Sequence, residues 1–142
     1  MVDITNAPTT VADEKSTTLA TIEIADIQIP EGGKPILERK MRVRRLDVFP
    51  DGIIGLHDHG NRPAILYVLR GSFTIYNANS DEPEVVNAGE AVTEFGQLKH
   101  WARNNSKSLP LAILTFDLLD DGAPPIAEKD CPICAAQAAS AK

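Results

Sequence analysis

The feature that most constrains the fold is a series of short segments with β-strand character, which fills the middle of the chain. Within these segments apolar and polar residues alternate, or apolar residues run on, and Gly, Pro and Asn separate one segment from the next. No segment before the C-terminal tail shows helical periodicity. The pattern predicts an all-β sandwich or barrel. The predicted strands cover residues 40–49, 53–59, 64–69, 72–76, 84–86, 91–95, 100–104 and 111–116.

A chain of 142 residues is long enough for one domain with its own core. We expect a flexible N-terminal arm over residues 1–18, a barrel over 19–120 and a C-terminal tail over 121–142. Residues 19–29 contain several isoleucines and end at Pro30, which predicts one or two further strands at the start of the barrel.

The formal net charge of −6 argues against a nucleic acid partner and against an anionic membrane surface. No apolar run approaches the roughly 20 residues of a membrane-spanning helix, so no membrane insertion is expected. The first residues lack a cationic segment followed by an apolar one, which is the pattern of a secretory signal. We therefore expect a cytoplasmic protein, or a periplasmic one if a signal peptide has been removed.

All three histidines fall in two short segments. His57 and His59 are two residues apart in a predicted strand, so their side chains project from one face and can bind one ion together. His100, on a later strand, can supply a third imidazole and leave coordination positions open, which suits a reactive metal ion. The alternative is a set of histidines that are only packed and hydrogen-bonded on a barrel wall.

The histidine pair also resembles the first motif of the cupin superfamily. That motif reads Gly, five residues, His-x-His, three or four residues, Glu, six residues, Gly. Here His57, His59 and Gly71 match, and the leading glycine is displaced by one position, at Gly52. The departure is at the Glu position, which is occupied by Ala64.

The third histidine lies in a segment similar to the second cupin motif. That motif reads Gly, five residues, Pro-x-Gly, two residues, His, three residues, Asn. Gly89, His100 and Asn104 match, whereas Phe95 and Gln97 stand in the Pro and second Gly positions. Two motifs in the family's order, with every histidine in place, make the resemblance specific for the fold and for a metal site.

The resemblance implies a double-stranded β-helix, or jelly-roll, barrel in which His57, His59 and His100 bind a divalent metal ion. Ala64 cannot supply the fourth ligand of the family, and three neutral imidazoles leave the full charge of the ion to attract an anionic bidentate molecule. Cupins with only three histidines are similar in this respect and act as Fe(II) dioxygenases. The family also implies a homodimer, in which the predicted strand over residues 21–29 is a candidate to cross to the partner.

Glu94 is the candidate catalytic residue. In the predicted strand 91–95, Val92 and Glu94 share a face, and on the inside of the barrel that carboxylate would approach the metal from a different strand than the usual Glu. There it could bind the metal, hydrogen-bond a histidine or act as a general base. The alternative is an exposed strand carboxylate.

Several charged and aromatic residues have two interpretations. Arg62 can hold a substrate carboxylate with its planar guanidinium, or it is a solvated loop charge. Arg42 and Arg44 share one strand face, which we expect to be solvated or to lie at a dimer edge. Trp101 should point away from the metal if His100 points towards it.

Cys131 and Cys134 form a C-x-x-C pair near the end of the chain. Such a pair can be redox-active or half of a zinc site. No thioredoxin-like pattern surrounds the pair and the barrel uses every histidine, so we expect an incidental or oxidisable pair. A zinc clasp shared between two chains is the alternative.

Together these features predict a metal-dependent enzyme with a small-molecule substrate. Fe(II) is favoured and Zn, Ni or Mn are alternatives, because imidazole suits all of them. The leading hypothesis is an O₂-dependent dioxygenase that acts on a small organic acid or diketone. A non-redox isomerase, lyase or hydrolase with the same site, and a small-ligand binding module, are the alternatives.

Overall fold

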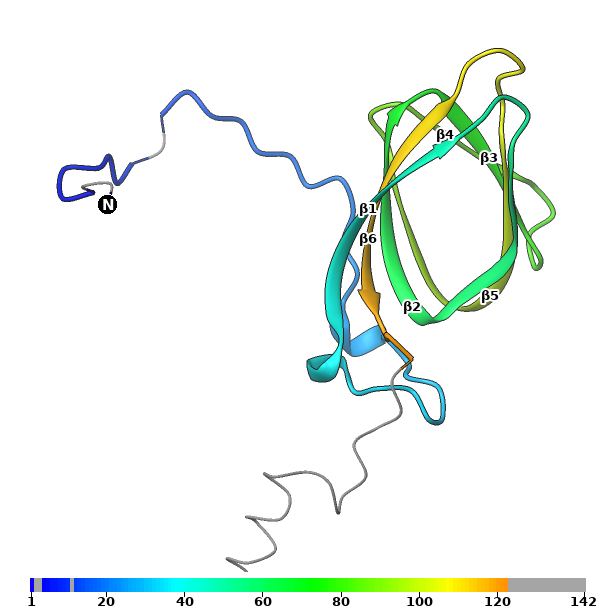
Figure 1. Ribbon diagram of the computed structural model, residues 1–142, viewed down its shortest axis with the longest axis horizontal. Helices are drawn as coiled ribbons and strands as arrows, with labels where there is room; N and C mark the ends of the chain where they lie inside the picture. Colours follow the sequence, from blue (N-terminus) through cyan, green and yellow to red (C-terminus); the bar gives the residue numbers. More distant parts are fainter. Residues whose placement is uncertain (2–3, 11, 123–142) are drawn as a thin grey trace, which may run out of the picture.

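One antiparallel sheet makes up the body of the molecule in a computed structural model, which describes residues 1, 4–10 and 12–122. The sheet has the strand order β1-β6-β2-β5-β3-β4 and curls on itself (Figure 1). The strands are β1 (Lys40–Val48), β2 (Ile53–Arg70), β3 (Ser72–Asn77), β4 (Glu84–Asn87), β5 (Ala91–Asn104) and β6 (Leu111–Leu119). Two 3-10 turns, Ile24–Asp26 and Ile36–Glu38, are the only helical elements in the part of the chain described. The predicted all-β jelly-roll barrel is confirmed.

Two pairs of predicted strands are single long strands in the structure. β2 joins the predicted segments 53–59 and 64–69, and β5 joins 91–95 and 100–104. The pairing of β2 with β5 shifts register three times between Ile54 and Ala64. Each irregularity bends the strand without ending its pairing, which lets one strand follow the curve of a barrel. The turn-like residues 60–63 therefore mark a bend and not a loop.

Side chains on the concave face of the curled sheet form the core, as the alternation of buried and exposed residues along β2 and β6 shows. Full burial of one large apolar side chain contributes about 1.5–3 kcal/mol, so this cluster is the main source of stability. Its members are Ala64, Leu66, Val68, Phe73, Ile75, Val86, Ala102, Leu111 and Ile113. Leu66, Phe73 and Ala102 also line the cavity described below, so the core and the cavity share a wall.

Asn104, at the end of β5, ties two connections together. Its side chain is 1% exposed, and its Nδ2 donates to the carbonyl oxygens of Val48 (3.0 Å), Phe49 (3.1 Å) and Leu109 (2.9 Å). Its Oδ1 accepts a hydrogen bond from the backbone N–H of Ser106. The last residue of the second motif therefore has a structural role, because its buried amide is fully hydrogen-bonded and joins the β1–β2 turn to the β5–β6 loop.

The strand predicted within residues 19–29 is wrong, because this segment holds only the 3-10 turn Ile24–Asp26. Ile22, Ile24 and Ile27 line an apolar groove with Ile65 and Phe116 on the outer face of the sheet. Their spacing of two and then three residues fits side chains that dock onto a surface and not the strict alternation of a strand. The homodimer that the resemblance implies stays a prediction.

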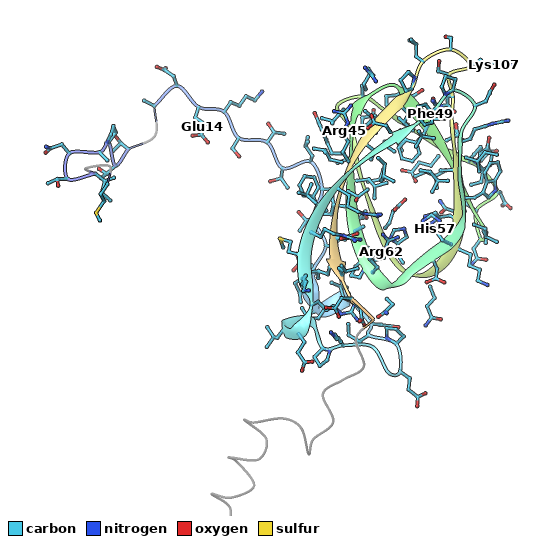
Figure 2. All side chains as sticks on the ribbon, viewed as in Figure 1. Glu14, Arg45, Phe49, His57, Arg62 and Lys107 are labelled. Carbon is cyan, nitrogen blue, oxygen red and sulfur yellow. The ribbon has the colours of Figure 1, made fainter. Side chains whose placement is uncertain are left out.

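The described residues before Thr17 extend away from the barrel and form no strand, as the position of Glu14 in Figure 2 illustrates. Thr17 and Thr18 line a groove with Ile65 on the outer face of the sheet. Most of the predicted tail, with Cys131 and Cys134, lies outside the described residues. Among the residues that the structure does describe, no helix is long and apolar enough to span a membrane.

Trp101 points out of the barrel, as predicted from its position next to His100. Its ring stacks on Tyr76 of the neighbouring strand β3, with ring centroids 4.1 Å apart and an interplanar angle of 8°. Tyr76 and Trp101 are direct partners in the register of β3 and β5, which places the two rings side by side on the outer surface.

Candidate metal centre

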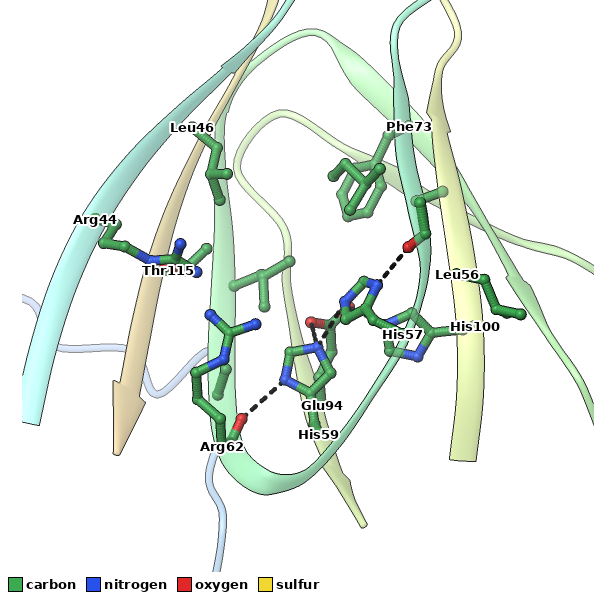
Figure 3. Close-up of a pocket in the computed structure, with 15 residues that line it drawn as sticks. Arg44, Leu46, Leu56, His57, His59, Arg62, Phe73, Glu94, His100 and Thr115 are labelled. Atoms are coloured by element: carbon green, nitrogen blue, oxygen red, sulfur yellow. Dashed lines mark hydrogen bonds and ion pairs between the residues drawn. The ribbon is translucent and has the colours of Figure 1, made fainter. Parts of the chain in front are cut away.

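The three histidines meet inside the barrel, where β2 and β5 run side by side (Figure 3). His57 is the register partner of His100, and His59 is on the same side of β2 as His57. The centroids of the three rings lie 4.6 to 5.1 Å apart, and His59 and His100 are 4% and 5% exposed. The structure thus brings together the three residues that the sequence proposed as ligands.

Backbone carbonyls fix the orientation of two of the imidazoles. The Nδ1 of His57 donates to the carbonyl oxygen of Gly55 (2.6 Å), and the Nδ1 of His59 donates to that of Arg62 (2.9 Å). A carbonyl oxygen can only accept, so both Nδ1 atoms carry hydrogen and both Nε2 atoms are turned into the cluster. Metal-binding histidines are oriented in the same way by a carbonyl on the other ring nitrogen.

Glu94 completes the cluster from β5. Its Oε2 lies 2.9 Å from Nε2 of His59, its Oε1 lies 3.4 Å from Nε2 of His100, and its side chain is 9% exposed. Glu94 is also the register partner of Ala64, the residue that occupies the Glu position of the first motif. A carboxylate is therefore present beside the imidazoles, but it projects from the strand opposite the usual one.

These four side chains fit a cation by the chemistry of their donors. One donor atom from each of His57, His59, Glu94 and His100 lies within 4.8 Å of the others. The Nε2 atoms of His57 and His59 are 3.0 Å apart, and Nε2 of His100 is buried without a hydrogen-bond partner. Lone pairs that face each other at this distance repel unless a cation or a proton lies among them.

His100 is held in the form that can bind a metal. Burial lowers its pKa, and the charges of His57 and His59 lower it further, whereas Glu94 acts in the opposite direction. Its imidazole is therefore neutral at neutral pH, as a metal ligand must be.

The cluster opens into a cavity of about 310 Å³, which is at the lower end of the range for small-molecule sites. The apolar side chains of Leu46, Ile54, Leu66 and Phe73 form one part of its wall. Arg44, Arg62 and Thr115 lie on the side of the cavity away from His57 and His100 (Figure 3).

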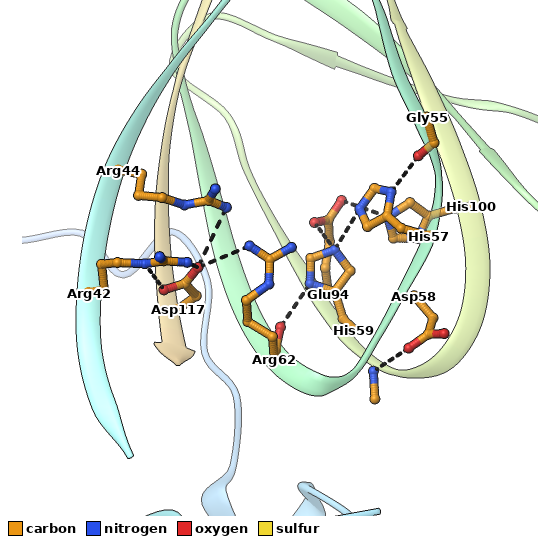
Figure 4. A network of polar contacts seen from close by, with 11 residues as sticks. Arg42, Arg44, Gly55, His57, Asp58, His59, Arg62, Glu94, His100 and Asp117 are labelled. Carbon is orange, nitrogen blue, oxygen red and sulfur yellow. Dashed lines mark hydrogen bonds and ion pairs between the residues drawn. The ribbon is translucent and has the colours of Figure 1, made fainter. Parts of the chain in front are cut away.

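The interpretation of Arg42 and Arg44 as a solvated or dimer-edge face differs from what the structure shows. Both side chains turn inward to Asp117, whose side chain is fully buried (Figure 4). Arg42 makes two hydrogen bonds to this carboxylate (3.0 and 2.8 Å), Arg44 lies 3.6 Å from it, and Arg62 donates to it at 3.3 Å. Arg62 is part of β2 and lines the cavity, so it is not a solvated loop charge.

Asp117 and Thr115 were missed by sequence reasoning, although the pattern of β6 contains a signal for them. Leu111, Ile113, Thr115 and Asp117 alternate along the strand, and all four are buried, so the inner face changes from apolar to polar at Thr115. Buried polar residues in an otherwise apolar strand indicate a polar site or network. Their partners could not be read from the sequence, because β1 and β6 are paired across about 70 residues.

The fold and the site together define a class: an antiparallel β-barrel with an imidazole and carboxylate cluster facing its interior. The model of the family described as "Cupin domain" matches residues 45–117, which is half of the chain. The chain belongs to the cupin family.

The matches to individual relatives cover only part of this chain and only part of each relative. The chain is 32% identical over 81 residues to germin-like protein subfamily 3 member 1 of Arabidopsis thaliana, and 33% identical over 81 residues to germin-like protein 1 of Brassica napus. Each match covers 55% of this chain and 39% of the relative, so the chain spans about two fifths of the length of these proteins.

Solved structures share the fold at low sequence identity. A Bacillus halodurans protein matches with a TM-score of 0.51 and 18% identity, over 68% of this chain and 75% of its own. The cupin domain of Schizosaccharomyces pombe Cnp3 matches with a TM-score of 0.51 and 7% identity, over 58% and 55%. Both comparisons show a shared fold.

Proposed function

We propose that this chain is a metal-dependent enzyme that binds Fe(II) and uses O₂ to oxidise a small organic acid or diketone. The observation that carries the proposal is the convergence of three imidazoles and one carboxylate on a cavity large enough for a small molecule. Two or three histidines with a carboxylate, with further positions left open, form the donor set of non-haem Fe(II) oxygenases. When bound, the ion would polarise the substrate and pass electrons from the substrate to O₂.

The residues of the chain have distinct tasks in this proposal. His57, His59 and His100 would hold the ion through their Nε2 atoms, and the carbonyls of Gly55 and Arg62 keep two of these rings in place. The apolar wall of the cavity excludes water from the reacting atoms. Glu94 would take or return a proton at Oε1 or Oε2, or add its charge to the ligand set.

The proposal is tested by elemental analysis of untagged protein purified without oxygen. We expect about one iron per chain, and loss of this metal from His57→Ala and from His100→Ala, because each variant removes one of three imidazoles. Iron-loaded protein should then consume O₂ in the presence of a substrate found by screening small acids. Stoichiometric iron in both variants would contradict the site.

The same donors suit Zn, Ni and Mn, so a non-redox isomerase or lyase is the second candidate. Turnover under anaerobic conditions with a redox-inert metal would favour that candidate over an oxygenase. Ligand binding that survives removal of the metal, without turnover on any acid tested, would favour a binding module.

A further inference from the structure

Two side chains that line the cavity each carry a buried hydrogen-bond donor without a partner. Both lie on the side of the cavity away from His57 and His100. Nε of Arg44 and Oγ1 of Thr115 are shielded from solvent and have no hydrogen-bond acceptor. The two residues are register partners on β1 and β6, so their side chains are neighbours on the inner face. A buried donor without an acceptor destabilises the empty protein, and an acceptor on a bound molecule would remove this penalty.

The same side of the cavity carries an excess of positive charge. The guanidiniums of Arg42, Arg44 and Arg62 surround the single carboxylate of Asp117, so three positive charges face one negative charge (Figure 4). Arg42 takes up that carboxylate with two hydrogen bonds at 3.0 and 2.8 Å. Arg44 and Arg62 make longer contacts with it, at 3.6 and 3.3 Å, and both line the cavity.

We infer that Arg44, Arg62 and Thr115 form a carboxylate-binding subsite on the side of the cavity away from His57 and His100. A planar carboxylate suits this set, because guanidinium groups and a hydroxyl can all donate to its two oxygens. The inference rests on the proposed function in one respect, because the other end of the bound substrate would lie at the metal. It selects acids over diketones: the substrate carries one anionic group at the subsite and a second polar end at the cluster.

The test measures binding and not turnover, on protein from which metal has been removed by a chelator. Succinate and its uncharged diamide, succinamide, are titrated by calorimetry, with malonate and glutarate to cover shorter and longer acids. We expect at least one of the three acids to bind and to be favoured over the diamide by about tenfold or more, because charge-assisted hydrogen bonds exceed neutral ones.

Matched variants assign the binding to the subsite. Arg44→Gln should weaken binding of the acid about tenfold or more, since it removes one charged donor. Arg45→Gln removes the same charge from the next residue of β1, whose side chain is 56% exposed and pairs with Asp47, and it should leave binding unchanged. Equal binding by Arg44→Gln and Arg45→Gln, or equal binding of the acid and its diamide, would overturn the inference, as would failure of all three acids to bind.

A second pair of variants separates binding from folding. Thr115→Val removes an unpartnered hydroxyl, so it should weaken acid binding while the protein stays as stable as the parent or becomes more stable. Thr74→Val removes a hydroxyl that donates to Asn105 at 2.7 Å outside the cavity, so it should lower stability and leave binding unchanged. Because metal is absent throughout, these results stand or fall separately from the metal content that tests the proposed function.

Discussion

The carboxylate of the cluster comes from β5 and not from β2, where the family motif places it. Ala64 stands where the first motif of the family has Glu, and Glu94 stands opposite Ala64 in the register of β2 and β5. The carboxylate therefore reaches the same imidazoles from the other strand, with its oxygens 2.9 and 3.4 Å from His59 and His100. The carboxylate that the motif places on β2 is supplied in this chain by the partner residue on β5.

This arrangement predicts how the cluster responds to loss of the charge. Glu94→Gln keeps the shape of the side chain but removes a negative charge beside the proposed cation, so affinity for Zn(II) should fall about 10–100-fold. The measurement is competition against a chromophoric chelator. Glu38→Gln, on an exposed residue of the turn Ile36–Glu38, is the control and should bind Zn(II) like the parent. Unchanged affinity in Glu94→Gln would remove Glu94 from the site.

The strands of the barrel are joined by connections that are distant in the sequence, and a few side chains hold these connections together. Asn104 is the clearest case, because its amide holds carbonyls from the β1–β2 turn and from the β5–β6 loop. The turns themselves rely on glycine: Gly71 between β2 and β3 and Gly89 between β4 and β5 have φ angles of 86° and 89°, which other residues rarely adopt.

We expect Asn104→Ala to destabilise the protein by about 3 kcal/mol, since it removes the three hydrogen bonds that this buried amide donates and the one that it accepts. Urea unfolding followed by circular dichroism measures this as a lower midpoint at an unchanged slope. Asn105→Ala is the matched control: its side chain is exposed and bonds to Thr74 and Ser72, so its cost should stay below about 1 kcal/mol. Equal midpoints for the two variants would contradict the role of Asn104.

The elements and the imidazole cluster could be predicted because they depend on local patterns. Alternation and apolar runs located the residues of all six strands, although β2 and β5 were each predicted as two strands. The spacing of His57 and His59 put both on one face. Features that depend on pairing between distant segments could not be predicted in the same way. The position of Glu94 opposite Ala64 requires the register of β2 and β5, and the burial of Asp117 under Arg42 requires the pairing of β1 and β6. Ile22, Ile24 and Ile27 resemble a strand in sequence because residues that dock onto an outer groove must also be apolar.

Asp117 joins three strands of the barrel to one another. It lies on β6, and its arginine partners lie on β1 and β2. Burial works to raise the pKa of Asp117, but the hydrogen bonds from Arg42 and the charges of Arg42, Arg44 and Arg62 outweigh it. The pKa of the folded state is therefore below the ordinary value of 3.8.

Because the folded state lowers this pKa, the ionised form of Asp117 stabilises the protein fully above pH 3.8, and the contribution is lost as pH falls further through the folded pKa. Asp117→Asn should lower the free energy of unfolding by about 1–3 kcal/mol at neutral pH, since it removes the only negative charge that these three partly exposed guanidiniums share. The difference in unfolding free energy between parent and variant should be constant above about pH 5 and shrink in stronger acid. A difference that does not depend on pH would show that the charge of Asp117 is not what stabilises the fold.

The stacked pair of Tyr76 and Trp101 gives the protein a built-in optical reporter. Trp101 is the single tryptophan of the chain, and it follows His100 directly on β5. Tryptophan fluorescence therefore comes from one position only. This position is next to the proposed ligand His100, on the outer side of the same strand. Filling of the cluster by a paramagnetic ion can be followed as quenching of that light, without a label and without a substrate.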